Sequence, residues 1–225
     1  MTKMFGSIPI MNWFTEKFYT NMITLSVIMI LIMIINKRIR EYYIKNQNYL
    51  TKEKVLLITG GCMGIGKEMI KILTNSYKCK IINVDIRDDL FDSLNEIVED
   101  QGNKIQNYKC DLSNFDQMEE IFKKILLENP KIDLLINNAA IAFNDFIYKL
   151  SKKEILKSID VNLTSPLLFT KLFLEEMEKY SEEEIHVVNI ASNLSHVVSR
   201  KSVPYIISKW GLYAMHEAIR YGEDF

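Results

Sequence analysis

The sequence contains few of the residues that stabilise disulfide-linked or metal-bound domains. Its 225 residues include only three cysteines, Cys62, Cys79 and Cys110, and no two of them form a C-x-x-C pair. This odd number of widely spaced cysteines argues against a disulfide framework and against a zinc site, so we expect a reducing compartment and no metal. The net charge is only −1, which argues against an overall basic field, so we expect no nucleic-acid partner.

Charged residues are absent from a long apolar run near the start of the chain. Residues 18–35 contain none, and a basic cluster at residues 37–40 follows at once. Such a run is near the lower limit for a helix that crosses a bilayer, and the basic cluster predicts that the following chain stays in the cytosol. We therefore expect an N-terminal hydrophobic helix that forms a membrane anchor at residues 1–36, followed by a polar juxtamembrane linker at residues 37–53.

An anchor has two alternatives for this run. A cleaved signal peptide fits poorly, because basic residues stand where a small-residue cleavage site is needed. A buried helix of a soluble domain also fits poorly, because the run is apolar on every face and has no polar stripe.

Residues 54–225 alternate short apolar runs with stretches of helical periodicity, which indicates an α/β domain. The predicted strands are residues 55–59, 80–85, 104–110, 133–137 and 185–191. The predicted helices are residues 67–77 and 90–100, a helix with Ser113 as its N-cap, residues 152–180, and residues 205–221 after Pro204. Strands that alternate with helices pair in parallel, and continuously apolar strands need helices on both faces. We expect a doubly wound parallel sheet whose ligands bind beyond the carboxyl ends of the strands.

A glycine-rich turn joins the first predicted strand to the first predicted helix. It reads T-G-G-C-M-G-I-G over residues 59–66, and glycines at such a place let the backbone approach a pyrophosphate at the helix N-terminus. Asp85 ends the second strand, where a carboxylate can accept hydrogen bonds from both ribose hydroxyls and repel a 2′-phosphate. These residues favour NAD over NADP, although Arg87 nearby weakens that preference. Asp111 is either an adenine contact or a capping acid beside Ser113.

Tyr205 and Lys209 lie four residues apart in the last predicted helix, so their side chains share a face. Tyrosine has a reference pKa of about 10, and a nearby lysine cation stabilises the tyrosinate. Such a pair can act as general acid and base on a carbonyl or an alcohol. Ser192 follows the fifth predicted strand and could hold the substrate oxygen.

Together these motifs resemble the classical short-chain dehydrogenases/reductases over residues 54–225. The family pattern T-G-x-x-x-G-x-G matches residues 59–66, and N-N-A-G matches residues 137–140, with Ala140 in place of the last glycine. The resemblance implies an NAD(P)-binding Rossmann fold with the catalytic residues Asn162, Ser192, Tyr205 and Lys209. It also implies the cofactor-binding residues Thr59, Gly60, Gly64, Ile65, Gly66, Asp85, Asp111, Leu112, Asn137, Ala139, Tyr205 and Lys209.

By the same resemblance, hydride passes to or from the nicotinamide ring while Tyr205 exchanges a proton with the substrate oxygen. Lys209 is expected to support the tyrosinate and to hold the nicotinamide ribose. Ser192 would position the substrate oxygen, and Asn162 would support a water in the proton relay. Without the family context, Asn162 is better interpreted as a helix-interior polar residue bonded to a neighbouring backbone.

Residues 190–220 are similar to the branch that holds membrane-anchored retinol dehydrogenases and 17-beta-hydroxysteroid dehydrogenases of the endoplasmic reticulum and lipid droplets. With the anchor, this implies an NAD-dependent enzyme on a membrane, facing the cytosol, that acts on lipophilic alcohols or ketones and touches membrane lipid. An NADP-dependent keto-lipid reductase is the alternative among enzymes. The family often dimerises, so a homodimer is a further expectation.

The family normally continues with a sixth and a seventh strand, and the sequence carries neither of them after residue 221. We therefore expect the fifth strand to form an open edge of the sheet. Two functional hypotheses follow. The chain is an oxidoreductase, shortened or completed by a partner, or it is a non-catalytic relative that serves as a binding or interaction module.

Overall fold

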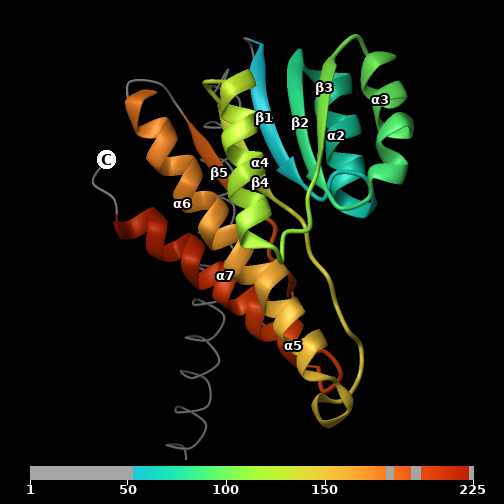
Figure 1. Cartoon of the computed structure of the whole chain (residues 1–225), viewed down its shortest axis with the longest axis vertical. Coiled ribbons are helices and arrows are strands. Elements are labelled where there is room, and N and C mark those ends of the chain that lie inside the picture. Colours follow the sequence, from blue (N-terminus) through green and yellow to red (C-terminus); the bar gives the residue numbers. More distant parts are fainter. Residues whose placement is uncertain (1–52, 181–184, 194–198, 223–225) are drawn as a thin grey trace, which may run out of the picture. The chain divides into compact units, whose positions relative to one another are not determined.

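The computed structural model describes residues 53–180, 185–193 and 199–222 (Figure 1). The expected anchor at residues 1–36 and residues 37–52 of the expected linker lie outside the described residues. Within the described part of the chain, every helix is too short or too polar to cross a membrane.

In the described part of the chain, five parallel strands form one sheet in the order β3-β2-β1-β4-β5 (Figure 1). They are β1 (Lys54–Thr59), β2 (Cys79–Asp85), β3 (Lys104–Lys109), β4 (Leu134–Asn137) and β5 (His186–Asn189). The direction of strand addition reverses at β1, which pairs with β2 on one side and with β4 on the other. The order confirms the predicted doubly wound parallel sheet and places β5 at an edge. The reversal at β1 places a ligand-binding crevice beyond the carboxyl ends of β1 and β4.

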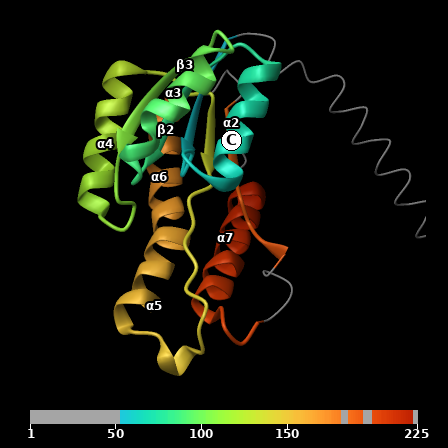
Figure 2. The ribbon, with the colours of Figure 1, turned by 90° about the vertical axis from the view of Figure 1, so that its right-hand side faces the viewer.

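Helices cover both faces of the sheet (Figure 2). They are α2 (Gly64–Ser76), α3 (Phe91–Glu99), α4 (Phe115–Glu128), α5 (Lys152–Ile159), α6 (Ser165–Met177) and α7 (Val203–Gly222), with short 3-10 turns η2 (Asp88–Leu90), η3 (Ile147–Lys149) and η5 (Glu178–Tyr180). On one face Phe122 of α4 meets Phe169 of α6 edge to face, with ring centroids 5.3 Å apart. On the other face Ile70 of α2 and Leu94 of α3 pack against the sheet. Two apolar clusters thus enclose the strands, as continuous apolar runs require.

The long helix predicted over residues 152–180 is interrupted in the structure. A π-helical turn, η4 (Asp160–Thr164), separates α5 from α6 and contains the buried Asn162. Pro166 explains the interruption, because it lacks the N–H that would donate to the carbonyl of Asn162 in an α-helix and its ring would clash with that carbonyl. The helical content was predicted correctly, whereas the wider turn was missed.

Three helix starts also differ from the prediction, and the first is that of α2, which begins at Gly64 and not at residue 67. Ser113 is not the N-cap of α4. Asn114 is, and its side-chain oxygen accepts from Gln117 N at 3.1 Å, while the Ser113 hydroxyl donates to Asp111 at 2.7 Å. Serine and asparagine both cap helices. Because the Ser113 hydroxyl donates to the Asp111 carboxylate, the cap falls to Asn114. Helix α7 includes Pro204 in its first turn, where a missing N–H does no harm.

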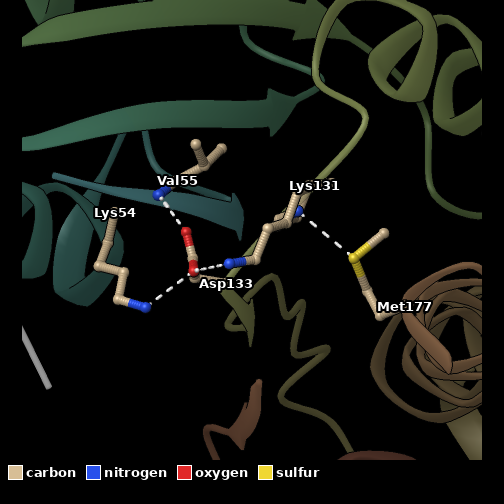
Figure 3. Close-up of polar contacts among 6 residues, drawn as sticks. Lys54, Val55, Lys131, Asp133 and Met177 are labelled. Carbon is tan, nitrogen blue, oxygen red and sulfur yellow. Dashed lines mark hydrogen bonds and ion pairs between the residues drawn. The ribbon is translucent and has the colours of Figure 1, made fainter. Parts of the chain in front are cut away.

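Asp133 joins β1, β4 and β5 at their amino ends. Figure 3 shows its carboxylate with Lys54, Val55 and Lys131. Its backbone N–H donates to Val55 O and its carbonyl accepts from His186 N. Its buried carboxylate accepts from Val55 N and from Lys54 Nζ, each at 2.9 Å, and lies 3.3 Å from Lys131 Nζ. Burial alone would raise the pKa of Asp133, but these hydrogen bonds and charges outweigh it and hold the pKa below its ordinary value.

The lowered pKa makes Asp133 a source of stability that depends on pH. Because the folded pKa lies below the ordinary value of 3.8, the carboxylate stabilises the fold above about pH 4 and this contribution disappears as pH falls through the folded pKa. We expect Asp133→Asn to lower the free energy of unfolding by about 2 kcal/mol at neutral pH. Urea unfolding at neutral and at acid pH measures the difference, which should shrink in acid.

The control variant is Glu119→Gln, which makes the same acid-to-amide change at an exposed position on α4. It should unfold like the unsubstituted chain at both pH values. An equal loss for Asp133→Asn in acid and at neutral pH would contradict the role assigned to the ionised carboxylate.

Candidate active site

A cavity of about 630 Å³ opens at the carboxyl ends of β1, β2 and β4, a volume typical of sites for small ligands. Seven of the predicted cofactor residues line it, namely Gly60, Gly64, Ile65, Asp85, Asp111, Leu112 and Ala139. Met63, Asn138, Lys157 and Val161 also line it and had no role assigned from the sequence. Arg87, which was expected to weaken the preference for NAD, lines it as well. The predicted residues Thr59, Gly66 and Asn137 are not part of the lining. Thr59 and Gly66 contact the backbone of residues that are, whereas the Asn137 side chain bonds within the sheet and to α6.

The glycine turn between β1 and α2 is shaped by close backbone contacts. Gly60 has φ +69°, and a Cβ there would lie 2.8 Å from the Cα of Ala139. A Cβ on Gly66 would collide with the carbonyl oxygen of Gly60. Only glycine therefore allows the turn, the start of α2 and the end of β4 to approach this closely.

Two polar side chains of β2 accept hydrogen bonds from the backbone of the same turn. Asn83 Oδ1 accepts from Gly61 N, and Asp85 Oδ2 accepts from Cys62 N, each at 2.9 Å. The other oxygen of Asp85 accepts from the backbone N of Arg87 at 3.0 Å. Asp85 thus lines the cavity, as predicted for a ribose acceptor, and also fixes the backbone on either side of it.

The first turn of α2 faces the cavity without a capping side chain. Its N-cap residue Met63 makes no side-chain cap, and no acidic residue lies in the first turn. Gly64 has φ +54°, and the place of its absent Cβ is open, with no other atom within 4 Å. The N–H groups and the positive dipole end of a helix attract an anion. This part of the cavity fits the pyrophosphate of a dinucleotide.

The sequence INNAAIAFND, residues 136–145, begins at the end of β4. Its first two asparagines form hydrogen bonds with the neighbouring strands. Asn138 Nδ2 donates to the carbonyl oxygens of Thr59 and Gly60, each at 2.9 Å. In return, the Thr59 hydroxyl accepts from the backbone N of Asn138 and of Ala139, each at 3.1 Å. Thr59 therefore holds the backbone of Asn138 and Ala139 in place and does not itself line the cavity. Ala139 reaches the wall.

Asn137 is buried inside the sheet. Its Nδ2 donates to Thr170 Oγ1 of α6 at 2.9 Å and to Asn189 Oδ1 of β5 at 2.8 Å. Asn189 Nδ2 in turn lies 3.3 Å from His216 Nδ1 of α7. The predicted cofactor residue Asn137 is thus placed as a polar tie between β4, β5 and two helices.

Asp111 lies where an adenine contact was expected, but it does not cap α4, whose N-cap is Asn114. It lines the cavity, and one carboxylate oxygen accepts from the backbone N of Ser113 at 3.0 Å and from its hydroxyl. The other oxygen lies 3.3 Å from Lys157 Nζ of α5. Burial tends to raise the pKa of Asp111, but the hydrogen bonds from Ser113 and the Lys157 charge outweigh it and lower the pKa.

Lys209 carries a buried amine between α7 and the segment that follows β5. Its Nζ donates to the carbonyl oxygen of Ile190 at 2.7 Å and lies 5.9 Å from the ring centroid of Tyr205. The side chain is almost fully buried, and this burial lowers the pKa of Lys209 to about 8. Because Ile190 precedes Ser192 by two residues, the contact brings the predicted Ser192 segment to the Tyr205–Lys209 pair.

Asn162 joins the same group of elements from the π-helical turn. Its Oδ1 accepts from Ile141 N, and its Nδ2 donates to Ile141 O, each at 2.8 Å. Nδ2 also donates to Ser208 Oγ at 3.1 Å, next to Lys209. The side chain is bonded to backbone, as the interpretation without the family predicted, and it fixes the loop after β4 and helix α7 beside Lys209.

Known proteins are similar to this chain in sequence or in fold. An uncharacterized oxidoreductase of Saccharomyces cerevisiae is 29% identical over 174 residues, which make up 77% of this chain and 54% of the yeast protein. Estradiol 17-beta-dehydrogenase 11 of Macaca fascicularis is 27% identical over 170 residues, 74% of this chain and 54% of that protein. The chain spans about half the length of these two relatives.

Among solved structures, an alcohol dehydrogenase from Thermococcus sibiricus is similar with a TM-score of 0.70 at 23% identity. The similarity covers 76% of this chain and 72% of that one, and it shows a shared fold. The family model described as short chain dehydrogenase matches residues 54–222, which include the glycine turn, the end of β4 and the Tyr205–Lys209 pair. The chain therefore belongs to the short-chain dehydrogenase family.

Proposed function

We propose that the chain is a membrane-associated oxidoreductase that transfers hydride between NAD(H) and a lipophilic alcohol or ketone. The observation that carries the chemistry is the buried amine of Lys209, held by the Ile190 carbonyl against the ring of Tyr205. A lysine in this position serves no evident packing purpose, because an apolar side chain would fill the site without a desolvation penalty. Membership of the dehydrogenase family supports the same chemistry.

The cofactor, when bound, supplies or accepts the hydride, and the residues of the chain handle the proton. In the reducing direction the Tyr205 hydroxyl donates its proton to the substrate oxygen, and in the oxidising direction the phenolate accepts it. The Lys209 cation stabilises the phenolate. The Ser192 hydroxyl donates a hydrogen bond to the substrate oxygen, and Asn162 keeps helix α7 in register with the loop after β4.

The preference for NAD rests on Asp85. Its carboxylate lines the cavity beside the glycine turn and accepts from Cys62 N and Arg87 N. A ribose with two free hydroxyls can donate to such a carboxylate, whereas a 2′-phosphate would be repelled by it.

The membrane and the substrate class are supported by the uncharged residues 18–35 and the basic residues that follow. The similarity to estradiol 17-beta-dehydrogenase 11, whose name states a steroid substrate, points in the same direction. We accordingly propose the endoplasmic reticulum or the lipid droplet as the location, with residues 54–225 in the cytosol.

The proposed activity is tested with the full chain purified in detergent micelles. We expect NADH to bind saturably, with energy transfer from Trp210 to the reduced nicotinamide. We also expect reduced nicotinamide to form from NAD⁺ with estradiol or retinol but not with glycerol. Tyr205→Phe should lower this turnover by about 10²–10⁴-fold, because it removes the proton donor and acceptor.

The matched control is Tyr213→Phe, which removes the hydroxyl of an exposed tyrosine further along α7 and should keep the turnover. A folded chain that binds neither NADH nor NAD⁺ would overturn the proposal and leave the non-catalytic binding module as the function.

The lowered pKa of Lys209 gives a second expectation. Since the folded pKa of about 8 lies below the ordinary 10.5, the unfolded chain binds more protons between these values, so stability rises with pH there and the buried cation destabilises the fold below pH 8. Lys209→Met should therefore abolish turnover yet raise the free energy of unfolding at neutral pH by about 1–2 kcal/mol, after allowance for the lost hydrogen bond.

Thermal unfolding at neutral and at alkaline pH measures this effect, and the gain should shrink as pH rises. Lys123→Met, at an exposed position on α4, is the control and should show no such pH-dependent gain. A Lys209→Met variant that is less stable at neutral pH would refute the assigned cost of the buried cation.

A further inference from the structure

We propose that Asp89 sets the cofactor preference of this site by holding the guanidinium of Arg87, so that the cation is not available to a 2′-phosphate. Asp89 is a positioning residue in this account, because it acts through Arg87 and not on the cofactor itself. The inference rests on the proposed function, in which the cavity at the glycine turn binds the adenosine half of a dinucleotide.

Arg87 follows β2 and lines the cavity. Its backbone N donates to Asp85 Oδ1 at 3.0 Å, so the cation rises from the same turn that holds the proposed ribose acceptor. Its Nη1 lies 3.3 Å from Met63 Sδ, at the N-cap of α2. The guanidinium is therefore positioned between the end of β2 and the glycine turn. An arginine in this neighbourhood accommodates the 2′-phosphate in NADP-binding Rossmann sites.

The guanidinium is already engaged by a carboxylate. Arg87 Nε donates to Asp89 Oδ1 and Nη2 donates to Asp89 Oδ2, each at 2.8 Å. These two bonds occupy one edge of the guanidinium, whose planar fork matches carboxylate and phosphate alike. A 2′-phosphate would have to displace Asp89 from this edge, and at the remaining donors it would still meet the negative charges of Asp85 and Asp89.

The second cation in the described lining of the cavity also pairs with a carboxylate. Lys157 lies 3.3 Å from the carboxylate of Asp111. Each described cation of the lining thus has an acidic partner. Of the two partners, Asp89 is the one that can be removed without breaking a turn, because Asp111 also accepts both hydrogen bonds of Ser113.

The neighbouring residue provides a matched control. Asp88 lies in the same 3-10 turn, η2, and like Asp89 it lies outside the described lining of the cavity, but its carboxylate pairs with Lys109 at 2.9 Å. Asp88→Asn and Asp89→Asn remove the same charge from adjacent positions. Only the second change releases Arg87.

The test measures dissociation constants of NADH and NADPH for the full chain in detergent micelles. Asp89→Asn should lower the ratio of the NADPH constant to the NADH constant by about fivefold, which is the scale of an exposed ion pair, and Asp88→Asn should leave the ratio unchanged. Asp89→Glu should largely restore the ratio. Arg87→Ala in the Asp89→Asn chain should remove the gain, and high salt should reduce it.

The possible outcomes separate this inference from the function beneath it. NADH binding to the unsubstituted chain, with the same ratio in Asp89→Asn as in Asp88→Asn, would overturn the role of Asp89 and leave the proposed function standing. Binding of neither nucleotide would overturn both. A gain in NADPH affinity that persists without Arg87 would also overturn the role, because it would reflect the removed charge alone.

Discussion

The hydrogen bonds of Asn138 are the constraint on which the candidate site depends. Two carbonyl oxygens, of Thr59 and Gly60, accept from one amide nitrogen of Asn138, and the Thr59 hydroxyl accepts in return from the backbone just after β4. This exchange fixes the glycine turn against the end of β4, and the contact of Gly66 with Gly60 then fixes the start of α2. Without these hydrogen bonds, four backbone groups would each lose a partner, and the backbone that lines the cavity would no longer be held in place.

The fold that positions the polar groups of the site is stabilised by contacts outside the site. Two apolar clusters enclose the sheet, and Asp133 fastens β1, β4 and β5 at the ends remote from the cavity. The site end instead buries Lys209 and relies on side-chain hydrogen bonds from Asn137 and Asn162 to position backbone. Stability and chemistry thus lie at opposite ends of the same strands, which is the usual arrangement in open parallel sheets.

Much of the fold could be predicted because its signals are local. Short runs between the helical stretches located the five strands to within two residues, and the 3.6-residue period located the helices. The errors were also local in cause. Ser113 and Asn114 are both good capping residues, and only the nearby Asp111 carboxylate decided between them. The π-helical turn at Asn162 had one available signal, Pro166 four residues later, whose effect on the carbonyl of Asn162 is a matter of covalent structure.

The sequence by itself determined the glycine turn, the Tyr205–Lys209 spacing and the acid at the end of β2, since each depends on residues close together in the chain. The tertiary structure alone decided what these residues meet. It placed Thr59 and Asn137 outside the lining of the cavity, brought Ile190 to the amine of Lys209, and engaged Arg87 with Asp89. The reason is physical: hydrogen bonds and burial depend on distances between groups, and only the pairing of the strands and the packing of the helices set those distances.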